Sequence, residues 1–222
     1  MRGPSTALTI LPPLAIDGHT SSGHGHPDHP MRRATRRAAG LDPGGWTKDL
    51  QREVVALFDG MAAEWHTRSS PERLAVVMDA LDRGLGRTNP ATGLAVEVGS
   101  GTGHYSGALA RRFRRVVAVD VSLEMLRLAP AGPGHRVLAD AATLPLADRT
   151  AAAVVLINAF LFPAEVDRVL APDGVLVWVN SSGEQTPIYL PPDDLLKALP
   201  GPWTGTTSRA GAGMWTVLRR AA

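Results

Sequence analysis

Apolar residues recur along most of the chain in two patterns, one helical and one strand-like. Between residues 49 and 85 they return every three or four positions, which predicts two amphipathic helices. Ser70 as N-cap and Pro71 in the first turn mark the start of the second helix. From residue 94 onward, short apolar runs of strand length alternate with helix-like segments, which predicts a different architecture for the rest of the chain.

This alternating part of the chain predicts a parallel sheet. The expected elements are strand 94–98, helix 104–112, strand 116–120, helix 122–129, strand 137–139, strand 152–158, helix 164–170, strand 175–180 and helix 193–199. Continuous apolar strands separated by helices are typical of parallel sheets covered on both faces. Residues 203–209 and 213–219 can pair as a hairpin. We therefore predict an α/β, Rossmann-like, doubly wound and mainly parallel sheet with a C-terminal antiparallel hairpin at one edge.

The first 45 residues show no sustained apolar periodicity. Gly, Pro, Ser and His dominate residues 18–30, and such a segment buries too little surface to offset its ordering entropy. We therefore predict a flexible tail over 1–45 and one domain over 46–222, with helices in 46–90 and the sheet in 91–222. The tail contains a group of side chains that could hold a metal ion, namely His19, His24, His26, Asp28 and His29. A flexible arm that contains these residues by chance is the simpler explanation, so no metal site is predicted.

Composition narrows the classes of function. The chain has 222 residues and no Cys, which excludes disulfides, thiolate metal sites and a cysteine nucleophile. No apolar run approaches the ~18 residues of a membrane span, so we expect a cytoplasmic protein. The first 48 residues hold six Lys/Arg against three Asp, which leaves 17 basic and 18 acidic residues in the rest. A domain that is nearly neutral does not favour nucleic acid as a partner.

The loop after the first predicted strand carries the strongest chemical signal. Residues 96–103 read Val-Glu-Val-Gly-Ser-Gly-Thr-Gly, and glycines in such a turn let the backbone approach a ligand closely. A dinucleotide fingerprint would need glycine at position 104, where this chain has His104. Glu97 would repel a pyrophosphate, but it would suit a ligand with an ammonium or sulfonium group. The loop therefore favours S-adenosylmethionine over a nicotinamide cofactor.

These residues and four further motifs resemble class I S-adenosylmethionine-dependent methyltransferases, in the style of the small-molecule enzymes of ubiquinone and menaquinone biosynthesis. The resemblance runs from about residue 58 to the C-terminus. Its motifs are the glycine-rich loop 97–103, the strand ends 119–126 and 139–145, the turn 170–176, and the upstream helix 58–65. In this family the upstream helix acts as a lid, so the N-terminal helices of this chain are expected to be lid helices.

The resemblance implies cofactor contacts at the ends of three successive strands. The methionine end would lie on the glycine-rich loop, the ribose at Asp120 and the adenine at Asp140. The full set of predicted cofactor-binding residues is Glu97, Gly99, Ser100, Gly101, Thr102, Gly103, Asp120, Val121, Met125, Asp140, Ala141, Asn158 and Trp65. Each motif alone is weak evidence. Three ligand-type positions in order after three strands are much harder to assemble by chance.

We therefore predict a methyltransferase that passes a methyl group from S-adenosylmethionine to a small-molecule acceptor, with S-adenosylhomocysteine as product. The connection after Asn158 is short, so residues 46–90 are expected to build most of the acceptor pocket. A place in the hydrophobic core explains Phe58 and Trp65 about as well as a role in a lid. Ser181 and Ser182 follow the strand 175–180 and would lie near an acceptor pocket, but local turn hydrogen bonds explain them equally well. No catalytic base is predicted, and a homodimer is left open. The alternative is a non-catalytic, degenerate methyltransferase-fold binding module or partner subunit.

Overall fold

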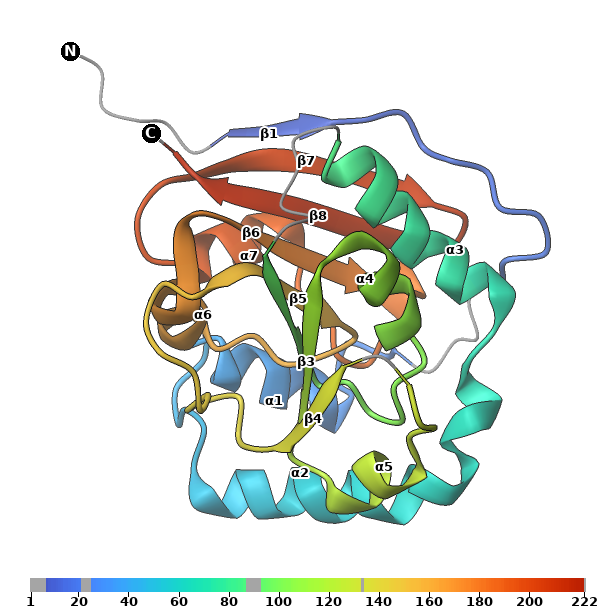
Figure 1. The fold of residues 1–222 in the computed structure, drawn as a ribbon, viewed down its shortest axis with the longest axis vertical. Coiled ribbons are helices and arrows are strands. Elements are labelled where there is room, and N and C mark those ends of the chain that lie inside the picture. Colours follow the sequence, from blue (N-terminus) through green and yellow to red (C-terminus); the bar gives the residue numbers. More distant parts are fainter. Residues whose placement is uncertain (1–6, 21–24, 87–92, 133, 222) are drawn as a thin grey trace.

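A computed structural model describes residues 7–20, 25–86, 93–132 and 134–221. Its described strands form one eight-stranded sheet in the order β1-β7-β8-β6-β5-β2-β3-β4 (Figure 1). They are β1 (Ala7–Ile10), β2 (Leu94–Val98), β3 (Arg115–Asp120), β4 (His135–Leu138), β5 (Ala151–Ile157), β6 (Leu170–Asn180), β7 (Trp203–Ala210) and β8 (Gly213–Arg220). Every pairing in this sheet is parallel except the two that β8 makes. The predicted mainly parallel sheet with a C-terminal hairpin is confirmed.

Three of the described α-helices begin at a serine or threonine that caps them. The described helices are α1 (Pro30–Ala38), α2 (Lys48–Met61), α3 (Pro71–Asp79), α4 (Ser106–Arg112), α5 (Leu123–Leu128), α6 (Pro163–Val169) and α7 (Pro192–Ala198), with the 3₁₀ and π-helical segments η1 (Ala62–Arg68), η2 (Ala80–Gly84) and η3 (Gly183–Gln185). Thr47, Ser70 and Ser122 each accept a hydrogen bond from a backbone N–H in the first turn of the helix that follows. The predicted start of the second helix at Ser70 and Pro71 is therefore confirmed.

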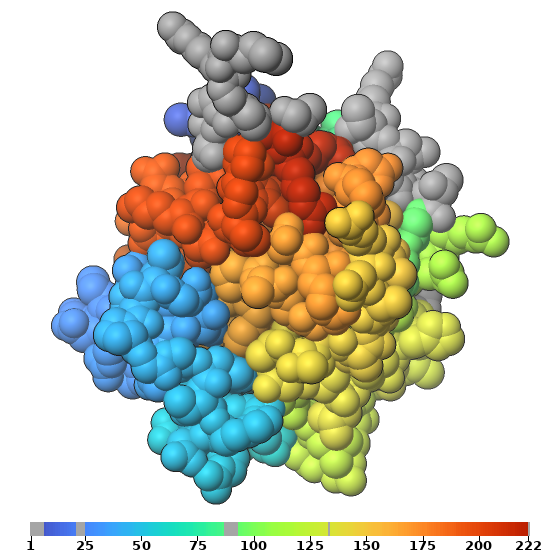
Figure 2. All heavy atoms as spheres, turned by 90° about the vertical axis from the view of Figure 1, so that its left-hand side faces the viewer, coloured from blue at the N-terminus to red at the C-terminus, as the bar shows by residue number. Residues whose placement is uncertain are grey.

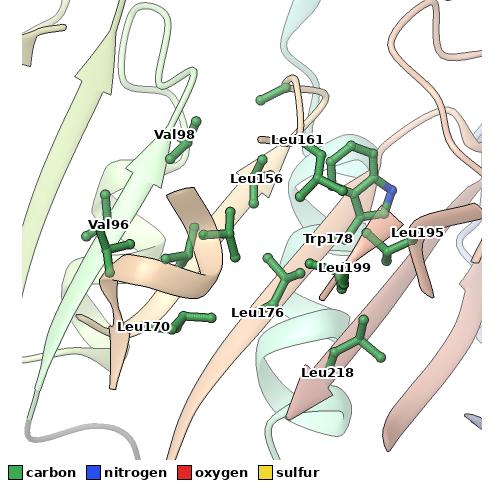
Figure 3. Close-up of a cluster of buried hydrophobic side chains, with 14 of the residues drawn as sticks. Val96, Val98, Leu156, Leu161, Leu170, Leu176, Trp178, Leu195, Leu199 and Leu218 are labelled. Atoms are coloured by element: carbon green, nitrogen blue, oxygen red, sulfur yellow. The ribbon is translucent and has the colours of Figure 1, made fainter. Parts of the chain in front are cut away.

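Alternating residues of the strands build two apolar layers, one on each face of the sheet. On one face, side chains from β2, β5, β6 and β8 pack against α6 and α7, as Figure 3 shows for Val96, Leu156 and Leu195 among others. On the other face, Ala95 and Val155 belong to a second layer that includes residues of α3, η2 and α4. Both faces of the central strands are buried, which explains their continuous apolar sequences.

The N-terminal region is where the structure departs from the sequence prediction. β1 pairs in parallel with β7, and Leu14 forms a further bridge to Ala210. In α1, Ala34 and Ala38 are buried. The prediction of a flexible tail over residues 1–45 is therefore corrected for the described segments, and β1 rather than the hairpin forms that edge of the sheet. A four-residue strand and a nine-residue helix carry too little periodicity to be recognised without the partners they pack on.

A third apolar cluster joins α1 and α2 to the loops at the carboxyl edge of the sheet. Its buried members are Ala34, Ala38, Leu50, Val54, Phe160, Phe162 and Ile188. Figure 2 shows the blue surface of the N-terminal helices lying against the orange and yellow surface of the later strands and loops. This cluster fixes α2 across the strand ends, the region where open parallel sheets bind ligands.

Candidate active site

A cavity of about 500 Å³ lies between the strand ends and the N-terminal helices. Its floor comes from the ends of β2, β3, β4 and β5 and the residues just after them. Its roof comes from α2 and η1, through Val54, Leu57, Phe58, Met61 and Trp65. The lining also includes His29, Met31 and residues of the segment 181–188. The N-terminal segment and the loop after β6 thus contribute to the cavity wall, while the expectation that residues 46–90 build most of the acceptor pocket stays a prediction.

Most of the predicted cofactor-binding residues line this cavity, namely Gly99, Ser100, Gly101, Asp120, Val121, Asp140, Ala141, Asn158 and Trp65. Four others, Glu97, Thr102, Gly103 and Met125, are not part of the lining. The structure thus brings together residues from four strand ends and from the roof. Their contacts with a cofactor stay a prediction.

The glycine-rich loop adopts a backbone that other residues would strain. Gly99 has φ +67° and Gly101 has φ +55°, both in the left-handed region. A Cβ on Gly99 would lie 2.7 Å from the Cβ of Ala159, and one on Gly101 would lie 3.1 Å from Nε1 of Trp65. The loop is tied to β3 by the Ser100 N–H, which donates to the carbonyl of Val119 at 3.0 Å. The glycines therefore permit both the turn and the close approach of the Trp65 roof.

Two hydroxyl groups on this loop are buried, and one of them belongs to a residue that lines the cavity. Ser100 Oγ and Thr102 Oγ1 are buried and have no hydrogen-bond partner within the part of the chain that the structure describes. Buried polar atoms are nearly always satisfied, so an unpaired one calls for a partner outside the chain. Ser100 lines the cavity whereas Thr102 does not, so the Ser100 hydroxyl fits a ligand that brings a polar group to the end of β2, as the amino-acid end of S-adenosylmethionine does.

Asp120 stands at the end of β3 with its carboxylate fixed by the backbone. Its Oδ2 accepts from the Gly101 N–H at 2.7 Å, and its Oδ1 accepts from the Ser122 N–H at 2.8 Å. Burial raises the pKa of Asp120, and these hydrogen bonds oppose that shift. A carboxylate has about four acceptor positions, so two remain after the backbone is satisfied. Asp120 is thus preorganised to accept a pair of hydroxyl groups.

Glu97 lies behind the loop, on the face of β2 that α4 covers. Its side chain is only 2% exposed, and Ser106 Oγ donates a hydrogen bond to its Oε2. Burial, together with the nearby charge of Asp120, raises the pKa of Glu97 to about 7, and the hydrogen bond from Ser106 opposes this shift. A cationic ligand on the loop would favour the ionised form. Glu97 is therefore not part of the cavity wall, and its contribution to cofactor binding stays a prediction.

Asp140 is held at the end of β4 by a group of aromatic residues that the sequence did not reveal. Trp46 Nε1 donates to Asp140 Oδ2 at 3.2 Å, and the Ala142 N–H donates to Oδ1 at 2.9 Å. The indole of Trp46 packs on Phe160 and Phe162, with ring centroids 5.3 and 5.1 Å away. These residues come from segments far apart in the sequence, so no local pattern could have pointed to them.

The ends of β5 and β6 are joined through side chains on the other side of the cavity. Asn158 has φ +52°; its Nδ2 donates to Ser181 Oγ and its Oδ1 accepts from the Ser181 N–H, both at 2.8 Å. Tyr105 lies close to Ser181, and burial raises the pKa of Tyr105. Ser181 therefore takes part in local hydrogen bonds and also lines the cavity with Tyr105, which the sequence analysis missed.

The N-terminal histidines have separate structural roles. His19 Nδ1 accepts from the Ala212 N–H at 3.2 Å, and His29 Nδ1 accepts from the Met31 N–H at the start of α1. His26 lies 3.5 Å from Asp28. Across residues 7–20, 25–86, 93–132 and 134–221, no three His, Asp or Glu side chains gather in a way that could hold a metal ion. His24 lies outside these ranges.

The strand order, the glycine turn after a central strand, and the carboxylates at the ends of the next two strands agree with the Rossmann-like fold that the sequence predicts. Residues 96–178 match the family model of a methyltransferase domain. The fold is shared with DhpI in complex with S-adenosylhomocysteine, at 20% identity and TM-score 0.64 over 79% of this chain and 99% of that one. It is also shared with the DhpI–SAM–HEP complex, at 22% identity and TM-score 0.58 over 78% and 99%.

The chain therefore shares the fold of these methyltransferases, and the family model of a methyltransferase domain matches part of it. No curated protein sequence matches the chain significantly. The narrower likeness to the ubiquinone and menaquinone type stays a prediction. Among the helices that the structure describes, none is long and apolar enough to cross a membrane.

Proposed function

We propose that this protein methylates a small molecule that binds beside the cofactor in the same cavity. The observation that carries the proposal is the continuity of the cavity, which runs from Asp140 and Asp120 past the glycine-rich loop to Ser181 and Ser182. Its wall is largely apolar and aromatic, with a small number of polar groups. Such a lining is typical of sites for small organic ligands.

In this proposal each strand end has one part of the cofactor to bind. Asp140 and the Trp46 indole would contact the adenine, Asp120 the ribose hydroxyls, and the Ser100 hydroxyl the amino-acid end. When bound, S-adenosylmethionine supplies an electrophilic methyl group, which a lone pair of the acceptor takes as the carbon–sulfur bond breaks. The protein's part is to align the acceptor and exclude water.

The roof and the loop before α4 would complete the site. Trp65 is half-buried, contacts Phe58 edge-on at 5.7 Å between centroids, and lies over Gly101, so it can exclude water there. Burial lowers the pKa of His104, so its imidazole is neutral at pH 7 and can accept a proton from the acceptor. Tyr105, with its raised pKa, stays protonated and can donate a hydrogen bond.

The proposal is tested by two measurements on the full chain. Calorimetric titration should show binding of S-adenosylmethionine and S-adenosylhomocysteine. A screen of phenols, amines, thiols and hydroxy acids should then give acceptor-dependent release of S-adenosylhomocysteine. Binding without turnover across the whole screen would favour the non-catalytic module instead. Absence of cofactor binding would contradict the proposal itself.

A further inference from the structure

We infer that the acceptor carries an anionic group, a carboxylate or a phosphonate-type oxyanion, which binds on the β6 side of the cavity near Arg73, Arg68 and Tyr105. This inference rests on the proposed function and names the substrate class for the same site. It follows from where the charged residues of the cavity lie.

The acidic and basic residues of the cavity lie in different places. Two carboxylates line it, Asp120 and Asp140. Both stand at the cofactor strand ends, and both accept hydrogen bonds from neighbouring N–H groups. The described lining includes no Asp or Glu near η1, the start of α3 or the end of β6. No carboxylate of the described lining would therefore repel an anionic group of a ligand in that region.

Basic groups gather in this second region. Arg73 Nη1 donates to the carbonyl of Arg68 at 2.6 Å, which joins the first turn of α3 to η1. The Arg68 guanidinium lies 5.4 Å from the centre of the Trp65 ring. His104 lies next to the backbone of Trp65 on the loop below. Arg68 and Arg73 both line the cavity, so positive charge lies at its entrance on this side.

Hydroxyl donors lie on the floor of the same region. Tyr105, Ser181 and Ser182 line the cavity, and Tyr105 is close enough to Arg73 for the charge of the guanidinium to lower its pKa against the larger effect of burial. An arginine beside hydroxyl groups is a common way to bind a carboxylate or phosphonate, because the planar guanidinium donates two parallel hydrogen bonds.

The order of the strands separates this group from the cofactor. The cofactor motifs follow β2, β3 and β4, whereas Ser181 follows β6, which lies on the far side of β5 from β2. Neighbouring strands are about 4.8 Å apart, so the ends of β6 and β2 are separated by about 10 Å. An anion at Ser181 and Arg73 would thus lie beyond the amino-acid end of the cofactor, on the side from which an acceptor enters.

The test uses the full chain saturated with S-adenosylhomocysteine and three probes of similar shape: benzoate, phenylphosphonate and the neutral benzamide. We expect both anions to bind at least tenfold more tightly than benzamide. The Arg73→Gln variant should lose at least tenfold in affinity for the anions, while its affinity for S-adenosylhomocysteine changes less than twofold. Arg73→Lys should lie between wild type and Arg73→Gln. Arg111→Gln removes the same charge from the exposed end of α4 and should change neither affinity.

Two results would overturn the inference. Equal binding of benzamide and the anions would show that the region has no preference for negative charge. An equal loss of S-adenosylhomocysteine and anion affinity in Arg73→Gln would place the guanidinium on the cofactor's own carboxylate. Failure of the wild-type chain to bind S-adenosylhomocysteine is a separate result, since it would contradict the proposed function before any probe is added.

Discussion

The strand-end half of the cavity is built from residues that follow their strands directly, whereas the roof half is assembled from segments far apart in the chain. Gly99, Asp120 and Asp140 each lie within two residues of the end of a strand. The roof combines α2 and η1 with the loop after β6 and residues near α1. The first half follows from local motifs, and the second forms only when the whole chain has folded.

The two halves also differ in charge and in rigidity. The strand-end half is acidic and its carboxylates are fixed by backbone N–H groups. The roof half is basic and aromatic, with Arg68 exposed and Trp65 half-buried. We therefore expect changes in the first half to alter mainly cofactor affinity. Changes in the second half should alter turnover and acceptor choice, and at Trp65, which lies over Gly101, cofactor affinity as well.

The largest expected effect distinguishes roof residues from core residues. Trp203 is completely buried, so Trp203→Ala should cost about 3–5 kcal/mol of stability. Trp65→Ala should cost about 1 kcal/mol, because only part of its ring is buried. Chemical denaturation measures both free energies of unfolding. Calorimetric titration should show weaker cofactor binding for Trp65→Ala, and unchanged binding per folded molecule for Trp203→Ala.

If Trp65→Ala instead costs as much stability as Trp203→Ala and leaves binding unchanged, Trp65 belongs to the core and the roof is not a lid. In that case the roof half would stabilise the fold without contributing to cofactor binding.

The next effect concerns Asp120 in the strand-end half. Asp120→Ala should remove two charge-assisted hydrogen bonds to the ribose, each worth about 1.5–3 kcal/mol, and so reduce cofactor affinity at least about a hundredfold. Part of this loss will come from the Gly101 and Ser122 N–H groups that the variant leaves unpaired. Asp173→Ala, which removes an exposed carboxylate from β6, is the matched control and should bind normally. Normal binding by Asp120→Ala would end this assignment.

A smaller effect is expected from the N-terminal strand. A chain that starts at residue 21 lacks β1 and its backbone hydrogen bonds to β7, and should lose about 2 kcal/mol of stability. Cofactor affinity should stay the same, because β1 lies at the opposite edge of the sheet from β2, β3 and β4. A chain that starts at residue 7 keeps β1 and is the control. Equal melting temperatures for the two chains would mean that β1 does not stabilise the domain.

The smallest effect concerns the pH dependence of binding through Glu97. Its pKa of about 7 means that the side chain is neutral at pH 6 and mostly ionised at pH 8. The affinity for the cationic cofactor should therefore rise up to about tenfold from pH 6 to pH 8. Glu97→Gln should bind more weakly at pH 8 and show a flat profile. If the cofactor affinity of the wild type changes as little with pH as that of the variant, the charge of Glu97 does not contribute to cofactor binding.

The same group links stability to pH. The pKa of Glu97 is higher in the folded chain than the ordinary value of 4.5, so the folded state binds more protons between pH 4.5 and 7. The stability of the cofactor-free protein should therefore fall as pH rises through this window. Glu97→Gln should lack this decrease, which melting curves between pH 5 and pH 8 would reveal.

The sequence predicted the sheet well because its signals are local. Continuous apolar runs marked the strands, and Ser70 and Pro71 marked a helix start, as the structure confirms. Asp120 and Asp140 line the cavity as expected because a residue that ends a parallel strand lies at the carboxyl edge.

What the sequence could not predict depends on contacts between distant segments. β1 has only four residues and forms because β7 offers a free edge. Trp46, Phe160 and Tyr105 belong to no motif that the sequence showed, and only the folded chain brings them to the cavity. Glu97 was expected to contact the ligand, yet it lies outside the cavity lining, since alternation along β2 turns its side chain towards α4.

The central claim is that the strand ends bind the cofactor while the β6 side of the same cavity receives the acceptor. A crystal structure of the protein with S-adenosylhomocysteine tests it most directly. We predict the ribose on Asp120, the adenine beside Asp140 and Trp46, and the sulfur facing the space lined by Tyr105, Ser181 and Arg73. Density for the ligand across the β6 side, or its absence from the strand ends of fully saturated protein, would contradict the account.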